Sequence, residues 1–185
     1  MPARISFVFS NREPGEHSES DRFFELVNGY GLPLVTISSR RFWGRAVPPT
    51  PQDREAYDSR VIQGLAKFST GICLLAGYML IASPLLSRRY NMINLHPATP
   101  GGPKGTWQEV TRQLMEQGAQ ATGVMMHLAT PELDQGPPVA YCRFPLRGET
   151  FDPLWRNMGD ITVTKIKGIN GDDHPLFYLI RQEGL

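Results

Sequence analysis

Short apolar runs alternate with longer amphipathic segments along the chain. The apolar runs are rich in Val, Ile, Leu and Phe and are bounded by Gly, Pro, Asn or Ser, a pattern typical of β-strands. It predicts strands at Ile5–Phe9, Leu34–Ile37, Gly71–Leu75, Met92–Leu95, Val124–Ala129 and Val139–Phe144. Because Gly71–Leu75 is apolar throughout, we expect it to be buried on both faces of a parallel sheet, whereas Val139–Phe144 is expected as an antiparallel edge strand.

Helical spacing of apolar residues and helix start signals mark the segments in between. They predict helices at Asp21–Tyr30, from Pro51 to about Phe68 and from Trp107 to about Gly118. Thr50 precedes Pro51 and Asp53, which together supply a capping oxygen, a proline in the first turn and an acid near the positive end of the helix dipole. Thr106 and Glu109 form a capping-box pattern at the start of the third helix.

The other segments carry weaker signals. Arg40–Pro51 is basic, aromatic and proline-containing, and is expected as a loop. Tyr78–Tyr90 is expected as a loop with a short helix. The C-terminal segments Ile161–Ile166 and Pro175–Arg181 have no clear assignment.

Strands that alternate with helices predict an α/β fold. We expect an open, mostly parallel twisted sheet of Rossmann-like type, with helices on both faces and right-handed crossovers. The length of 185 residues corresponds to a single domain over residues 1–185. In such sheets, ligands bind beyond the carboxyl ends of the strands.

Charge and composition favour a small polar substrate. The formal net charge is +1 and the charged residues are spread along the chain, so we expect neither nucleic acid nor an anionic membrane as a partner. The uncharged stretch Ser69–Ser87 is interrupted by Gly, Ser and Pro, which indicates a strand and a turn rather than a membrane span. Polar residues follow the first apolar run without a signal-peptide pattern, so the expected compartment is the cytosol.

The two cysteines, Cys73 and Cys142, both fall inside apolar segments. This placement predicts reduced core thiols rather than a disulfide framework or a metal site.

Two polar motifs follow strand-like runs and supply the candidate chemistry. The first is Asn94-Leu95-His96-Pro97, and the second is Glu132–Pro137, which contains Asp134. Side chains two apart in a strand point the same way, so Asn94 and His96 should share a face while Leu95 turns into the core. Pro97 should end the strand.

An amide, an imidazole and a carboxylate in one cleft suit the attack of an amine on a carbonyl carbon. Asn94 and a protonated His96 can donate to the developing oxyanion, and Asp134 can hold the imidazole in its charged form and relay a proton. No serine or cysteine stands out as a nucleophile, which favours direct transfer over a covalent intermediate.

Structural interpretations of the same residues remain open. His96 can be a satisfied buried histidine, Asn94 a strand-end residue and Asp134 a turn former. A metal site built from His96, His127 and Asp134 is a weaker alternative because no close ligand pair such as His-x-x-x-His is present, and we expect no metal.

Six segments taken in order carry a resemblance to a known family. They are Ile5–Arg12, Arg54–Asp58, Leu75–Met79, Asn94–Pro97, Gly123–His127 and Glu132–Pro137. At these positions the chain resembles the folate-dependent formyltransferases, and within them the branch that acts in purine biosynthesis. The resemblance covers about Ile5 to Pro145 and implies the Rossmann-like formyltransferase fold.

The resemblance implies a reaction and a catalytic trio. The formyl donor would be 10-formyltetrahydrofolate and the acceptor the amine of glycinamide ribonucleotide, with Asn94, His96 and Asp134 as the catalytic residues. It also implies binding residues. The pteridine slot would be formed by Met79, Leu80, Ile81 and Ala82 together with Thr130 and Leu133. Arg54 would lie near the substrate phosphate, His127 would line the cleft, and Gly105 would close the loop after the Asn-x-His motif.

The resemblance places Ile5–Arg12 at the family's second strand, so we expect the first strand and its phosphate loop to be absent, together with a C-terminal extension. Three alternatives therefore stay open. One is a related formyltransferase acting on a sugar nucleotide or methionyl-tRNA, another is a formyltetrahydrofolate deformylase with water as acceptor, and the third is an inactive folate-binding protein. A homodimer is compatible with each of them.

Overall fold

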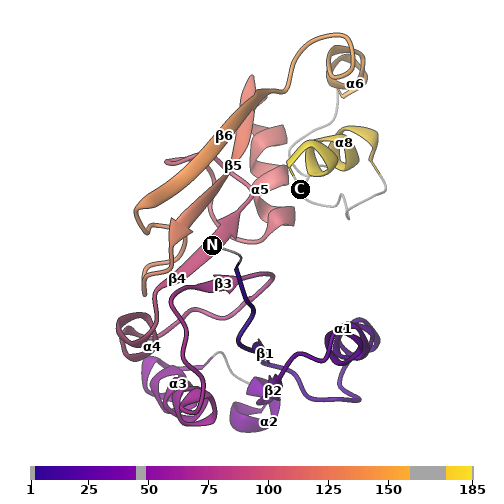
Figure 1. Ribbon diagram of the computed structural model, residues 1–185. Coiled ribbons are helices and arrows are strands. Elements are labelled where there is room, and N and C mark those ends of the chain that lie inside the picture. The colour runs from indigo at the N-terminus through magenta and orange to yellow at the C-terminus, as the bar shows by residue number, and fades with distance from the viewer. Residues whose placement is uncertain (1–2, 45–48, 159–173, 185) are drawn as a thin grey trace. The chain divides into compact units, whose positions relative to one another are not determined.

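The computed structural model describes residues 3–44, 49–158 and 174–184. The chain divides into two compact units, Met1–Met92 and Ile93–Leu185 (Figure 1), and each unit is described by itself.

The first unit contains a parallel strand pair joined by a helix. Strand β1 (Val8–Ser10) pairs with β2 (Leu34–Thr36), with Val8 opposite Leu34. Helix α1 (Ser18–Gly29) connects the two strands and buries Phe24 and Val27. Both strands and the helix were predicted, although β1 is shorter than expected and the helix begins three residues earlier.

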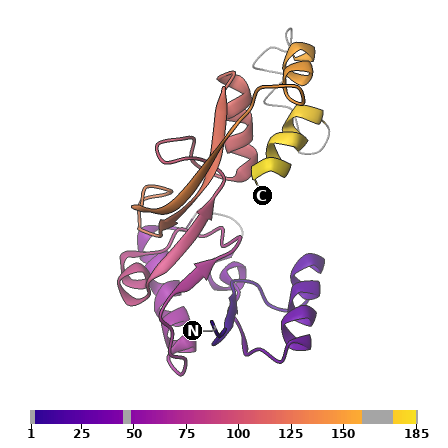
Figure 2. The same ribbon diagram turned by 45° about the horizontal axis from the view of Figure 1, so that its top comes forward.

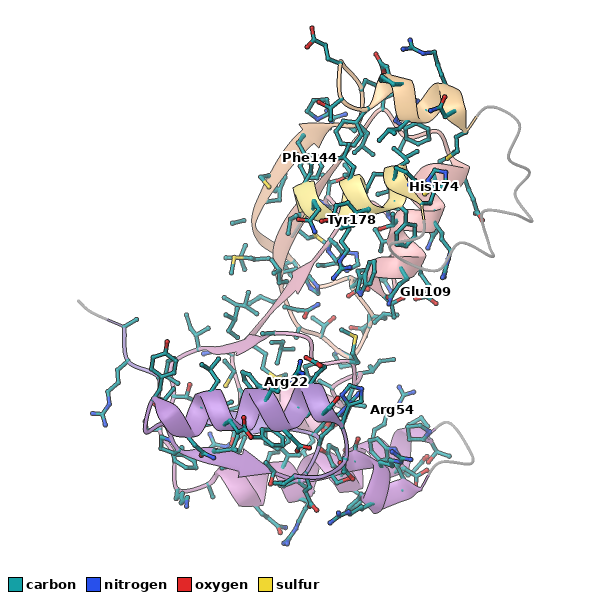
Figure 3. All side chains as sticks on the ribbon, turned by 90° about the vertical axis from the view of Figure 1, so that its right-hand side faces the viewer. Arg22, Arg54, Glu109, Phe144, His174 and Tyr178 are labelled. Carbon is teal, nitrogen blue, oxygen red and sulfur yellow. The ribbon has the colours of Figure 1, made fainter. Side chains whose placement is uncertain are left out.

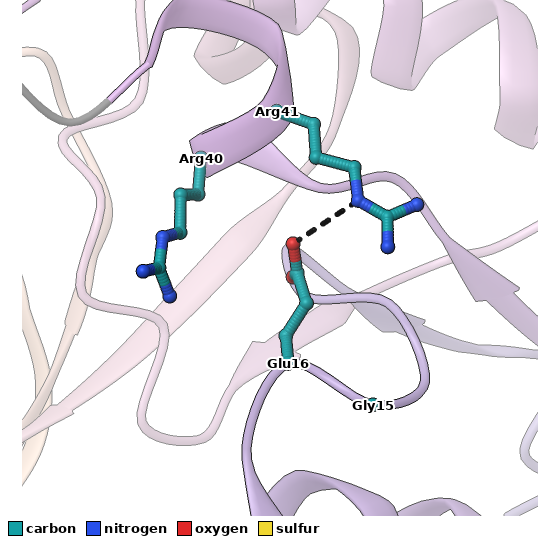
Figure 4. A pocket seen from close by; sticks show the side chains of 4 residues that line it. All are labelled: Gly15, Glu16, Arg40 and Arg41. Carbon is teal, nitrogen blue, oxygen red and sulfur yellow. Dashed lines mark ion pairs between the residues drawn. The ribbon is translucent and has the colours of Figure 1, made fainter.

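Helix α2 (Ser39–Trp43) corrects the expectation that Arg40–Pro51 is a loop throughout. The Ser38 hydroxyl accepts the N–H of Arg41 and caps the helix, and Gly44, at φ 77°, ends it. The Arg41 guanidinium pairs with Glu13 and with Glu16, the latter at 3.6 Å between Nε and Oε1 (Figure 4). The helix is held by these tertiary contacts, which the local sequence does not reveal.

Helix α3 (Pro51–Leu65) starts as the sequence predicts. The Thr50 hydroxyl accepts the N–H of Asp53, and the Asp53 carboxylate accepts the N–H of Thr50, which completes a capping box. The helix ends at Leu65, three residues short of the expected Phe68.

Strand β3 (Cys73–Leu75) and helix α4 (Pro84–Arg89) complete the first unit. The N–H of Cys73 donates to the carbonyl of Asn91 at 2.8 Å. The expectation that β3 is buried on both faces is wrong, because 61% of Leu74 is exposed. An apolar run shows that the side chains are hydrophobic, but it does not show whether another element covers them.

The second unit is built on antiparallel strands. Strand β4 (Met92–His96) begins at the last residue of the first unit, and β5 (Ala121–Leu128) pairs antiparallel with both β4 and β6 (Pro138–Pro145). The α/β class is confirmed, and the parallel arrangement holds for β1 and β2. The antiparallel pairing of β4 with β5 was not expected, since hydrophobic periodicity carries no information about strand direction.

Among the described residues, two helices supply buried side chains to the core of the second unit, α5 (Trp107–Glu116) and α8 (Pro175–Gly184). Helix α6 (Asp152–Asn157) packs partly buried side chains against this core. In Figures 1 and 2, α5 and α8 lie side by side near β5 and β6. The buried cluster includes Val110 and Leu114 from α5 and Leu176 and Phe177 from α8. Phe144 of β6 packs against this cluster (Figure 3).

Helix α8 assigns the segment Pro175–Arg181, whereas Ile161–Ile166 lies outside the described residues. Within the described part of the chain, no helix is long and apolar enough to cross a membrane.

Both cysteines are free thiols, as predicted. Cys73 is half-buried, but Cys142 is exposed, so its expected position in the core is wrong. Cys142 lies on β6, whose residues are mostly exposed because this strand stands at the edge of the sheet.

Candidate functional site

Asn94 and His96 lie on one face of β4, near its carboxyl end. They pair across the antiparallel ladder with His127 and Met125 of β5. His96 is buried and Asn94 is half-buried. Leu95 points to the opposite face and is 47% exposed, so the expectation that it turns into the core is wrong. The predicted alternation of side chains along the strand is correct, but the face that the rest of the unit covers is the one that carries Asn94 and His96.

The turn after β5 brings Asp134 to this face. Its backbone has φ 52°, the left-handed region that non-glycine residues rarely adopt. Asp134 is fixed there by a hydrogen bond in which the N–H of Gly105 donates to Oδ2 at 3.0 Å. The Asp134 side chain is only 6% exposed. The structure therefore adds a buried carboxylate and a hydrogen bond from a distant loop to the turn that the sequence predicts.

His96 is oriented by the loop that follows β4. Its Nε2 lies 2.8 Å from the carbonyl oxygen of Pro103. Because a carbonyl can only accept, Nε2 must carry a proton, and Nδ1 is left to face Asp134 Oδ2 at 3.5 Å. A second proton on this imidazole would therefore be shared with the Asp134 carboxylate.

His127 faces the same carboxylate from β5. Its Nδ1–H donates to the carbonyl of Leu128 at 2.9 Å, and its Nε2 lies 3.7 Å from Asp134 Oδ1. The amide of Asn94 donates to this Nε2 at 3.2 Å when the imidazole is neutral. Asp134 thus stands between two imidazoles whose ring centroids are 6.2 Å apart, with Asn94 beside them.

Gly136 allows this arrangement and was missed in the sequence. A Cβ at Gly136 would lie 1.6 Å from the carbonyl oxygen of Leu128 and 3.2 Å from His127 Nδ1. The turn can therefore approach the end of β5 only with glycine here. The Gly136-Pro137 pair after Asp134 was the available signal. The carbonyl of Pro103, a backbone group, has no sequence signal at all.

Residues 26–151 match the sequence model of the family described as Formyl transferase. The chain belongs to this family. The match runs from within α1 to the turn before α6. It includes Asn94, His96, His127 and Asp134, which we call the polar cluster.

Curated relatives in this family are similar over part of their length. Phosphoribosylglycinamide formyltransferase of Escherichia coli is 34% identical over 154 residues, which cover 81% of this chain and 64% of the relative. The enzyme of the same name from Schizosaccharomyces pombe is 31% identical over 100 residues, or 50% of this chain and 48% of the relative. The chain thus spans less than two thirds of the length of both relatives.

Solved structures show the fold. A phosphoribosylglycinamide formyltransferase from Campylobacter jejuni superposes with a TM-score of 0.63 at 23% identity, covering 89% of this chain and 80% of the other. The formyltransferase fold that the resemblance implied is therefore confirmed.

The binding residues implied by the family resemblance are divided between the two units. Thr130 and Leu133 lie in the second unit, in the segment that leads to Asp134. The Thr130 hydroxyl donates to the carbonyl of Glu132, and Leu133 is 47% exposed. Gly105, at φ 109°, holds Asp134 through its N–H, and a Cβ there would lie 2.5 Å from Glu109 Oε2.

The other members lie in the first unit. Arg54 is half-buried on α3 (Figure 3), and the segment before α4 holds the four residues Met79, Leu80, Ile81 and Ala82. Exposure falls along this segment from Met79, which is 67% exposed, to Ala82, which is buried.

His96, His127 and Asp134 do not form a group that could hold a metal ion, and no such group is found among the described residues. The carboxylate instead faces two imidazoles with backbone and amide partners, an arrangement suited to holding and moving protons.

Proposed function

We propose that the chain transfers a formyl group from 10-formyltetrahydrofolate to the amine of glycinamide ribonucleotide, a step of purine biosynthesis. The observation that carries the proposal is the position of Asp134 between His96 and His127, with Asn94 at hydrogen-bond distance from His127. Membership of the formyl transferase family and the names of the two curated relatives support the same reaction.

In the proposed reaction, the amine nitrogen attacks the formyl carbon and a carbon–nitrogen bond forms. The formyl oxygen becomes an oxyanion, which Asn94 stabilises through the amide hydrogen that His127 does not use. His96 stabilises it through a proton on Nδ1, the ring nitrogen that Pro103 leaves free. The Asp134 carboxylate accepts the proton that the amine loses. The bond to N10 of the folate then breaks as N10 takes up this proton from Asp134.

Binding is assigned to both units. In the first unit, the backbone and side chains of residues 79–82 are assigned to the pteridine, and the exposure of Met79 supports this role. In the second unit, Thr130 and Leu133 are assigned to the pteridine, and Leu133 is likewise exposed. The Arg54 guanidinium suits the substrate phosphate, because its planar donors match phosphate oxygens. Gly105, in the loop that follows β4, and His127, on β5, are assigned as contacts of the substrate.

The variant Asp134→Asn tests the central role of the carboxylate. An amide keeps the size of the side chain but cannot take up a proton, so formyl transfer should fall by about 10²- to 10⁴-fold. The measurement is the absorbance of the folate product from 10-formyl-5,8-dideazafolate and glycinamide ribonucleotide. The matched control is Glu132→Gln, an exposed residue of the same turn, which should keep wild-type turnover.

An Asp134→Asn variant with wild-type turnover would remove the carboxylate from the mechanism. Formate release that does not depend on the amine would replace the proposed acceptor with water. Folate binding without turnover in the wild type would identify a binding protein.

The proposal extends to compartment and assembly. The free thiols of Cys73 and Cys142 fit the reducing cytosol. The exposed strand β6, with Val139 and Tyr141 on it, offers an edge for a homodimer, which sedimentation at several protein concentrations would detect.

A further inference from the structure

Asp58 is a buried carboxylate in the first unit that the proposed chemistry does not use. It lies on α3 and is 2% exposed. A carboxylate is costly to bury unless hydrogen bonds compensate for the lost water. Burial raises the pKa of the Asp58 carboxyl, and its hydrogen bonds with Ser83 act in the opposite direction.

The carboxylate holds the residue that follows the proposed folate segment. The N–H of Ser83 donates to Asp58 Oδ2 at 2.6 Å. Ser83 is itself the N-cap of α4, and its hydroxyl accepts the N–H of Leu86 at 3.4 Å. One short contact therefore fixes both the start of α4 and the end of the segment 79–82.

The residue before the segment, Tyr78, is packed inside the first unit. The hydroxyl of Tyr78 is buried and has no hydrogen-bond partner among the described residues. Burial is the main cause that raises the pKa of Tyr78, and the charge of Asp58 raises it further. The Tyr78 ring packs 6.3 Å from that of Phe9 on β1. The segment 79–82 thus runs from Tyr78, whose ring packs on Phe9, to Ser83, which the Asp58 carboxylate holds.

We propose that Asp58 is a positioning residue for the folate segment: its contact with Ser83 sets the conformation in which residues 79–82 meet the pteridine. The folate part of this inference rests on the proposed function, whereas the contact itself does not. Asp58 acts on the ligand only through the backbone that it holds.

The test compares Asp58→Ala with Asp58→Asn. The alanine removes the acceptor for the N–H of Ser83, so the dissociation constant for 10-formyl-5,8-dideazafolate should rise by about tenfold or more. The asparagine keeps an acceptor oxygen, so its constant should stay within about threefold of the wild type. Binding is measured by fluorescence titration of folded protein, with the KM for glycinamide ribonucleotide expected to stay unchanged. The control is Glu55→Gln, an exposed carboxylate on the same helix.

A folded Asp58→Ala variant that binds the folate as tightly as the wild type would overturn the proposal. So would an Asp58→Asn variant that loses as much affinity as the alanine.

Amide hydrogen exchange of the wild type provides a second test that does not require the alanine variant to fold. The N–H of Ser83 should exchange as slowly as the central amides of α3, and exchange as fast as that of Met79 would overturn the contact. A wild type that binds no folate but protects Ser83 would contradict the proposed function and leave the contact intact.

Discussion

At the scale of single residues, Asp134 shows how a local signal and a tertiary one combine. The sequence around it supports both a turn and a catalytic carboxylate. The structure gives it a left-handed backbone and three polar neighbours, Gly105, His96 and His127. The shared face of Asn94 and His96 was predictable, because side chains two apart in a strand point the same way. Asp134 reaches that face through the turn after the antiparallel strand β5, and strand direction cannot be predicted from the hydrophobic pattern. The exposure of Leu95 was not predictable either, because it depends on what packs over each face.

Gly136 supports a prediction at this scale. In Gly136→Ala, the new Cβ would collide with the carbonyl of Leu128, so the free energy of unfolding should fall by about 1–3 kcal/mol. The measurement is urea denaturation. The control is Gly29→Ala, at the end of α1, where nothing lies within 4 Å and the expected change is within about 1 kcal/mol. A Gly136→Ala variant as stable as the control would show that the turn can move away from β5.

At the scale of elements, the starts of helices could be predicted from the sequence, whereas the exposure and the direction of strands could not. The caps at Thr50 and Thr106 open α3 and α5 as expected, because capping depends on residues three apart in the sequence. Helix α2 was missed because its contacts with Glu13 and Glu16 come from a distant loop. The exposure of β3 and the direction of β5 likewise depend on the rest of the fold.

The capping box of α5 predicts a pH dependence. Hydrogen bonds from the backbone and side chain of Thr106 lower the pKa of Glu109 below its ordinary value of 4.5. A lowered folded-state pKa adds stability above pH 4.5 that is lost as the pH falls through the folded-state value. Thermal unfolding between pH 3 and pH 6 should therefore show a smaller loss on acidification in Glu109→Gln than in the wild type.

The control is Glu116→Gln, which removes a carboxylate at the other end of α5, outside the capping box. If acidification lowers the stability of Glu109→Gln as much as that of the wild type, the capping box does not contribute to the pH dependence.

At the scale of the whole molecule, the alternation of strands and helices was sufficient to predict an α/β fold. The order of six short motifs was sufficient to predict the formyltransferase family. The division of the binding residues between two compact units was not predictable, because it follows from contacts across many residues. The polar cluster lies in one unit, and the proposed folate segment with its anchor Asp58 lies in the other.

The most direct test of the proposed formyl transfer follows a labelled formyl group. The chain is incubated with 10-[¹³C]formyltetrahydrofolate and glycinamide ribonucleotide, and the products are identified by NMR. If the chain formylates the amine, the label appears in the amide formed there, and Asp134→Asn abolishes its appearance. Label found only in formate, or remaining in the folate at every acceptor concentration, would contradict the proposed transfer.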